Sequence, residues 1–125
     1  LQVMATIVSQ SSSAHAPEWF TTAPIEAISN IFKKASLDAD NIDLWEINEA
    51  FAVVPMAAIE KFNLNHEKVN VNGGAIALGH PIGASGARIL TTLIYSMKKL
   101  NVERGVASLC IGGGEASALL VEREK

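Results

Sequence analysis

Apolar residues recur along the chain with two different spacings, and the alternation between them predicts the order of strands and helices. Short apolar runs, typical of buried strands, lie at residues 3–8, 43–47, 69–71, 106–111 and 116–122. Between successive members of the first four runs, apolar side chains recur every three to four residues, as they do on the buried face of a helix. These helical stretches run from Pro24 to Leu37, from Ala50 to Phe62 and from Ser85 onward.

Two features affect these boundaries. Ser11, Ser12 and Ser13 bound the first apolar run, so we expect a loop from there to Ala23. Pro55 falls inside the second helical stretch, and proline is comfortable only in the first turn of a helix. That helix is therefore either kinked at Pro55 or starts later than its apolar pattern suggests.

The order of strand and helix, three times over and then two strands, predicts an α/β fold. We expect a mainly parallel sheet in βαβαβαββ order, covered by helices, with the last strand antiparallel after a turn through three glycines. Residues 106–111 carry apolar or small side chains on both faces, which suits a strand in the interior of the sheet. No repeat or linker divides the chain, so we expect one domain over residues 1–125.

Composition narrows the function classes. The chain has 125 residues, 49% of them apolar, and a formal net charge of −3, so it lacks the basic surface of a nucleic-acid or anionic-membrane binder. No apolar run approaches the roughly 20 residues that cross a bilayer. The single cysteine cannot form an internal disulfide, which suits a reducing compartment. We expect a soluble, cytoplasmic protein. A strand that begins almost at Leu1 suggests a segment cut from a longer protein, whose targeting signals would lie upstream.

Polar groups with catalytic potential follow three of the predicted strands. Asn48 and Glu49 follow the second strand, His80 lies in the loop after the third, and Cys110 lies near the end of the fourth. Each alone has a structural explanation: Asn48 as a helix cap, His80 as a hydrogen-bonding loop residue and Cys110 as a small buried apolar residue. Ligands gather at the carboxyl ends of strands in open α/β sheets, so the shared position of these residues favours one site.

Glycines surround two of these residues. Residues 72–86 hold five glycines, which let backbone N–H groups and a helix N-terminus approach a negatively charged group. A phosphate-binding loop is the alternative, but the spacing fits neither the dinucleotide-binding nor the P-loop pattern. Three glycines that begin at Gly112 also follow Cys110 and Ile111, and their N–H groups are free to meet an oxyanion. The alternative there is a plain tight turn between strands.

Three ordered motifs resemble the C-terminal motifs of thiolases. They are Asn48-Glu49-Ala50-Phe51-Ala52, residues 72–88 with Gly79-His80-Pro81 inside them, and Cys110-Ile111-Gly112-Gly113-Gly114. The similarity spans nearly the whole chain and is weakest over residues 11–23, where His15 and Trp19 match nothing that we can assign. Ketoacyl synthases also use a Gly-His loop, but they typically have a second histidine in place of Asn48 and lack the Cys-x-Gly-Gly-Gly motif. Thiolase is therefore the closer match.

The resemblance implies the C-terminal catalytic half of a thiolase-like fold, in an acyltransferase that forms or cleaves carbon–carbon bonds between coenzyme A thioesters. His80 matches the residue that raises the thiolate fraction of the nucleophile and donates to the thioester oxygen of the attacking acetyl group. Cys110 matches the proton-transfer cysteine, Asn48 the residue that fixes an oxyanion-hole water, and Gly112 the N–H of the other oxyanion hole. Acetyl-CoA and acyl-CoA are the implied substrates, without a separate cofactor or metal, in a homo-oligomer that is a dimer or tetramer.

Three hypotheses follow from these residues. In the first, the chain is part of a thiolase; the family's nucleophilic cysteine belongs to an N-terminal half, and Cys110 is the only cysteine here, so the chain alone is expected to be inactive. In the second, the same fold serves as a non-catalytic binding or assembly module. The third, a metal hydrolase using His80, Cys110 and Glu49, is disfavoured because no His or Cys pair has ligand spacing. His15 and His66 are interpreted as ordinary surface residues.

Overall fold

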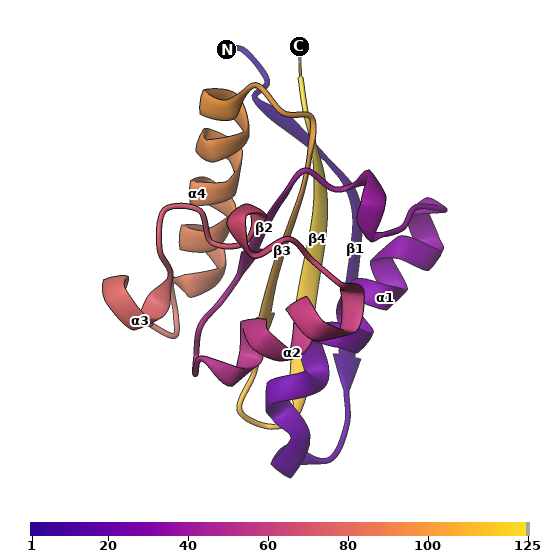
Figure 1. Ribbon diagram of the computed structural model, residues 1–125, viewed down its shortest axis with the longest axis vertical. Coiled ribbons are helices and arrows are strands. Elements are labelled where there is room, and N and C mark those ends of the chain that lie inside the picture. Colours follow the sequence, from indigo (N-terminus) through magenta and orange to yellow (C-terminus); the bar gives the residue numbers. More distant parts are fainter. Residues whose placement is uncertain (125) are drawn as a thin grey trace.

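The computed structural model describes residues 1–124, which form a four-stranded sheet with helices on both faces (Figure 1). The strands are β1 (Ala5–Ala14), β2 (Leu44–Ile47), β3 (Arg104–Cys110) and β4 (Glu115–Arg123), and their order across the sheet is β1-β4-β3-β2. The α-helices are α1 (Ala23–Ala35), α2 (Val53–Phe62), α3 (Ala75–Leu78) and α4 (Ser85–Leu100). Short 3-10 helices lie at η1 (Pro17–Thr22), η2 (Ala39–Asn41) and η3 (His66–Lys68). Within residues 1–124, no helix combines the length and the apolar character needed to cross a bilayer.

The sheet is mixed, so the expectation of a mainly parallel sheet is wrong. β2 pairs with β3 in parallel, whereas β4 pairs antiparallel with both β3 and β1. The antiparallel course of the last strand is as predicted. The expected third strand at residues 69–71 is reduced to one parallel bridge between Val69 and Trp45.

Asn70 explains why that third strand does not form. Its backbone is left-handed, with φ of 49°, which ends any extended run. Its side-chain amide accepts from the N–H of Ile47 and donates to the carbonyl of Ile47, both at 2.9 Å. A side chain therefore takes over the backbone pairing that a neighbouring strand would have provided to β2.

The first strand is longer than its apolar run. Ser11 and Ser13, which we expected in a loop, lie inside β1 and face α1. The Ser11 hydroxyl donates to the carbonyl of Ala27 at 2.6 Å, and the Ser13 hydroxyl donates to the carbonyl of Ala23 at 2.9 Å. Serine is small enough to let the helix approach this strand, and its hydroxyl is satisfied by the helix backbone.

β3 lies in the interior of the sheet, as predicted, and both of its faces are covered. On one face Val106 and Cys110 join a core with α1 and α2. On the other face Ala107 packs in a second core with Ile89, Leu93 and Met97 of α4. Two separate helix layers therefore hold the strand that ends at Cys110.

The helices begin close to their predicted positions, with one informative difference. α2 starts at Val53, so Pro55 is the third helical residue and lies in the first turn, where its missing N–H is tolerated. The later start was one of the two expected outcomes. Phe51 falls inside the helical stretch predicted from Ala50, but in the structure it precedes the helix and is 60% exposed.

Glu46 is the only buried carboxylate among residues 1–124. Its side chain is 2% exposed; Oε2 lies 3.5 Å from Nη1 of Arg88, and Oε1 has no hydrogen-bond partner in the described chain. Burial raises the pKa of Glu46 to about 7, because desolvation outweighs the opposing effect of Arg88 and the Glu49 carboxylate adds to it. Folding therefore favours the protonated form of this side chain.

We predict that Glu46→Gln stabilises the chain at pH 8 and leaves its stability unchanged at pH 4. A carboxyl whose pKa is higher in the folded than in the unfolded state stabilises the fold below the unfolded pKa and loses that contribution as pH rises to the folded value. The wild type should therefore lose up to roughly 3 kcal/mol relative to the variant between about pH 4.5 and 7. Urea unfolding across this range measures the difference. The exposed Glu60→Gln variant of α2 is the control for loss of one negative charge. A pH-independent gap between wild type and Glu46→Gln would contradict the prediction.

Candidate active site

The site is built at the edge of the sheet where β2 and β3 end. Because these two strands are parallel, their carboxyl ends meet, and Ile47 lies opposite Ser108. Asn48 continues from β2, and its N–H donates to the carbonyl of Ser108 at 2.9 Å. Cys110 is the last residue of β3. The expectation that Asn48 and Cys110 share one sheet edge is confirmed.

His80 reaches the same place from a loop rather than from a strand end. It lies between α3 and α4, after Gly79. Nδ1 of His80 is 2.6 Å from the hydroxyl oxygen of Ser85, the first residue of α4. Nδ2 of Asn48 lies 3.4 Å from Nδ1 and 3.5 Å from Nε2 of His80. These nearly equal distances place the Asn48 amide beside the ring, not in line with one ring nitrogen.

His80, Cys110 and Gly112 line one cavity of about 660 Å³. The rest of its wall is largely apolar and includes Phe20 of η1 and Phe51, whose rings meet edge to face with centroids 6.1 Å apart. The predicted grouping of His80 and Cys110 in one cleft is confirmed. Asn48 is 1% exposed and contacts the histidine without lining the cavity.

Burial affects the Cys110 thiol and the Asn48 side-chain amide of the site in different ways. Burial raises the pKa of the Cys110 thiol, because desolvation disfavours the thiolate. Oδ1 of Asn48 is buried and has no hydrogen-bond partner among residues 1–124. An unsatisfied amide oxygen at this depth costs free energy unless a water or ligand meets it.

The glycine-rich segment after Cys110 forms a tight turn and also presents a backbone N–H that is free to donate. Ile111 and Glu115 close it with an N–H to carbonyl bond of 2.7 Å, while the N–H of Gly112 has no acceptor within the described residues. Gly114 has φ of 105°, and a Cβ there would overlap the carbonyl oxygen of His15. Glycine is required at that position, and the turn leaves the Gly112 N–H free beside the cavity.

Glu49 fixes the glycine-rich loop to the sheet edge. Its Oε1 accepts from Nδ2 of Asn70 at 3.0 Å, and its Oε2 accepts from the N–H of Ile76 at 3.0 Å. Gly74 lies directly over this carboxylate, and a Cβ on Gly74 would overlap it. At least one glycine of the loop thus approaches a carboxylate of the protein itself, not a ligand, and a side chain there would displace Glu49 from its two partners.

Some parts of the site were not anticipated from the sequence. Ser85 was interpreted only as the start of a helix, although its position five residues after His80, across a turn through Pro81, was a usable signal. Phe20 and Ile82 also line the cavity, but Phe20 lies in the segment where no motif could be assigned. His15 is bonded within that segment, with Nε2 donating to the carbonyl of Trp19 at 2.7 Å.

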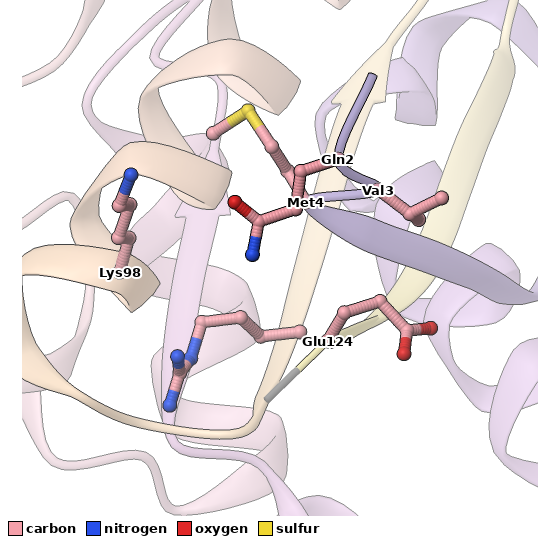
Figure 2. A pocket seen from close by; sticks show the side chains of 6 residues that line it. Gln2, Val3, Met4, Lys98 and Glu124 are labelled. Atoms are coloured by element: carbon pink, nitrogen blue, oxygen red, sulfur yellow. The ribbon is translucent and has the colours of Figure 1, made fainter.

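The rest of the described surface lacks a cluster of metal-binding side chains but has another, smaller hollow. No group of three or more His, Cys, Asp or Glu side chains in residues 1–124 could hold a metal ion. A smaller hollow of about 140 Å³ lies between the last turn of α4, the start of β1 and the end of β4, lined by Lys98, Met4 and Glu124 among others (Figure 2). Arg123 there already donates to the carbonyl of Val102 and to Oδ1 of Asn101. Within residues 1–124, the cavity at His80 is where His80, Cys110 and Gly112, three of the residues predicted to be catalytic, come together.

The family follows from sequence and fold together. Residues 1–123 match the family model described as the C-terminal domain of thiolase. The chain belongs to the thiolase family, as its C-terminal domain.

Individual relatives agree with this assignment. The chain is 52% identical to acetyl-CoA acetyltransferase 2 of Arabidopsis thaliana over 122 residues, which is 98% of this chain and 30% of that protein. It is 50% identical to the cytosolic acetyl-CoA acetyltransferase of Mus musculus, covering 98% of this chain and 31% of that protein. The chain therefore spans about a third of the length of the relatives that it matches.

Solved structures show the same arrangement. The acetyl-CoA acetyltransferase of Bacillus anthracis superimposes with a TM-score of 0.96 at 44% identity, covering 99% of this chain and 32% of that one. The Acat5 thiolase of Ascaris suum, solved in complex with coenzyme A, superimposes with a TM-score of 0.94 at 45% identity and covers the same shares. The mixed sheet described above is thus an arrangement shared with known thiolases.

We predict that Gly74→Ala destabilises the chain by about 1–3 kcal/mol, because the added methyl group displaces the Glu49 carboxylate from Asn70 and Ile76. Gly83→Ala is the matched control, since a Cβ on Gly83 meets nothing within 4 Å. Its effect should stay below about 0.5 kcal/mol. Urea unfolding measures both.

A double-mutant cycle tests the cause of that loss. In a Glu49→Ala background the methyl group has room, so Gly74→Ala should cost less there than in the wild type. Equal costs in the two backgrounds would show that Glu49 is not the group that requires glycine.

Proposed function

We propose that this chain supplies the proton-transfer and oxyanion groups of a thiolase reaction, the transfer of an acyl group between coenzyme A thioesters with formation or cleavage of a carbon–carbon bond. The supporting observation is that His80, Cys110 and Gly112 line one cavity while Asn48 contacts His80. The acyl-accepting thiol comes from a thiolase segment outside these residues, because Cys110 is the only cysteine of the chain and its buried thiol suits a different task.

In this proposal His80 acts as the base for the acyl-accepting thiol. A free thiol has a pKa of about 8.5, so a neighbouring imidazole that takes the proton raises the thiolate fraction near neutral pH. His80 is held by a loop anchored at both ends, to Ser85 on one side and through Glu49 and Ile76 on the other. Such anchoring keeps a general base within the narrow range of geometry that proton transfer requires.

Cys110 acts as the acid and base at the α-carbon. Burial raises the pKa of its thiol, so the thiolate is scarce but, once formed, is a stronger base than an exposed one. In the condensation direction the Cys110 thiolate accepts the α-proton of acetyl-CoA, and the resulting carbanion attacks the acyl thioester on the nucleophile. The new carbon–carbon bond forms as the C–S bond of that thioester breaks, and the nucleophile leaves as a thiolate. In the cleavage direction the Cys110 thiol returns that proton to carbon.

Asn48 and Gly112 stabilise the negative charge that develops on the thioester oxygens. The buried, unsatisfied Oδ1 of Asn48 shows a polar group in need of a partner, and a bound water would meet that need while Nδ2 remains beside His80. The N–H of Gly112 is free beside the cavity, as an oxyanion donor must be.

The substrates and setting follow the same proposal. We infer that the cavity accepts acetyl-CoA and acyl-CoA, in a homo-oligomeric enzyme of the cytoplasm with no separate cofactor. The coenzyme A complex of the Ascaris suum thiolase and the cytosolic relative from Mus musculus support these choices. A non-catalytic thiolase-fold module is the second candidate, because the fold by itself does not require turnover.

The proposal is tested in a chimera, in which this chain replaces the matched segment of the Arabidopsis thaliana acetyl-CoA acetyltransferase 2. We expect the chimera to cleave acetoacetyl-CoA in the presence of coenzyme A, and His80→Ala to reduce that rate by at least about 10²-fold. His66→Ala, an exposed histidine outside the cavity, is the control and should retain full activity. A chimera that folds with the unfolding temperature of its parent but is inactive would favour the non-catalytic module.

A second prediction separates the role of Cys110 from that of His80. In the chimera, Cys110→Ala should retain acylation of the nucleophile by acyl-CoA, seen by mass spectrometry, and lose at least about 10²-fold in deuterium exchange at the acetyl methyl group. His80→Ala should impair both. If the Cys110→Ala chimera exchanged methyl protons at the unmodified rate, Cys110 would be a buried packing residue and nothing more.

A further inference from the structure

Ser85 makes the shortest contact that His80 has with the protein. Its hydroxyl oxygen is 2.6 Å from Nδ1 of His80 and 3.1 Å from the carbonyl oxygen of Pro81, and the residue is 1% exposed. A hydroxyl carries a single proton, so it can donate to only one of these two neighbours. Which neighbour receives the proton decides which nitrogen of His80 is free.

The carbonyl is the better destination for the Ser85 proton. A carbonyl oxygen can only accept, so a hydroxyl that donated to His80 would turn its own lone pairs toward the Pro81 oxygen at 3.1 Å. Serines in helices commonly donate to the carbonyl four residues earlier. Two other helical serines of this chain do so: Ser29 donates to Ile25 and Ser96 donates to Thr92, each at 2.8 Å.

The remaining neighbour of the His80 ring does not change this assignment. Nδ2 of Asn48 is a donor, so it cannot accept a proton from Nδ1. Among the contacts of His80 in the described chain, the Ser85 oxygen is the only acceptor for an N–H at Nδ1.

We propose that Ser85 is a positioning residue that holds neutral His80 with its proton on Nδ1 and thereby leaves Nε2 as the basic nitrogen at the cavity. The tautomer itself depends only on the geometry above. Its catalytic consequence rests on the proposed function: Nε2 can accept the proton of the acyl-accepting thiol at once, while the Nδ1–H bond to Ser85 steadies the imidazolium that results.

The tautomer can be read directly in this 125-residue chain by NMR of ¹⁵N-labelled histidine at about pH 8.5. His80 should show the proton on Nδ1. His15 is an internal reference for the other tautomer, because its Nε2 donates to the Trp19 carbonyl at 2.7 Å and must carry the proton. A His80 spectrum with the proton on Nε2 overturns the proposal without any substitution being made.

Substitutions then test the role of the hydroxyl. Ser85→Ala should shift His80 away from the Nδ1–H form and leave His15 unchanged, whereas Ser85→Thr, which keeps a hydroxyl, should preserve the wild-type tautomer. Ser29→Ala removes a comparable helical serine remote from the site and should leave both histidines as they were. An unchanged His80 tautomer in Ser85→Ala would assign the preference to some other group and overturn the role of Ser85.

The chimera supplies the functional arm. There Ser85→Ala should lower the rate of nucleophile acylation by about 10- to 100-fold with little change in KM, part of the effect that a positioned general base provides. Wild-type acylation in an active Ser85→Ala chimera would refute the positioning role and leave the proposed function standing. An inactive chimera with native Ser85 would instead refute the proposed function. The NMR measurement would still decide the His80 tautomer, because it does not depend on activity.

Discussion

The parallel pairing of β2 with β3 is the constraint on which the site depends. It brings the ends of two strands that are far apart in sequence to one edge, where the Asn48 N–H bonds to the carbonyl of Ser108 and Cys110 ends the neighbouring strand. Parallel strands cannot be joined by a short turn, so a crossover connection has to leave this edge and return. That crossover contains α2, α3 and α4, and it carries His80 back to the edge that β2 and β3 define.

Along this crossover, side chains form hydrogen bonds with backbone groups that have no partner in a neighbouring strand. Asn70 replaces a strand by bonding both backbone groups of Ile47, and the same amide donates to Glu49. Glu49 then accepts from the N–H of Ile76 in α3, the short helix that precedes His80. The loop is rich in glycine partly because Gly74 must pass over this carboxylate. The position of His80 is therefore set by a chain of polar contacts that begins in β2.

Regular periodicity and motif spacing were sufficient to predict α1, α2 and α4, the interior place of β3 and the grouping of His80 with Cys110, whereas α3 lies in a segment expected to be a loop. These patterns failed where a side chain forms hydrogen bonds with backbone groups of another segment. Val69 to Val71 has the composition of a strand, but the left-handed Asn70 interrupts it and leaves a single bridge. The sheet is mixed for another reason: β4 pairs antiparallel with both β3 and β1. Ser11 and Ser13 have the composition of a loop, yet they form part of a strand because the carbonyls of α1 accept their hydroxyl protons. Contacts between segments remote in sequence leave no local pattern, and Phe20 in the cavity wall is of the same kind.

Desolvation affects two acidic groups near this sheet edge in the same direction, with different results. Burial raises the pKa of Glu46 in β2 and that of Cys110 in β3. Glu46 lies beside Arg88 on the face covered by α4, away from the cavity, so its altered proton affinity affects stability. Cys110 lines the cavity, so the same physical effect gives a thiolate that is stronger as a base and less populated. A base of that kind works only if the charge that it creates is stabilised elsewhere in the site. In the proposed reaction, Asn48, the free N–H of Gly112 and the anchored ring of His80 would stabilise that charge.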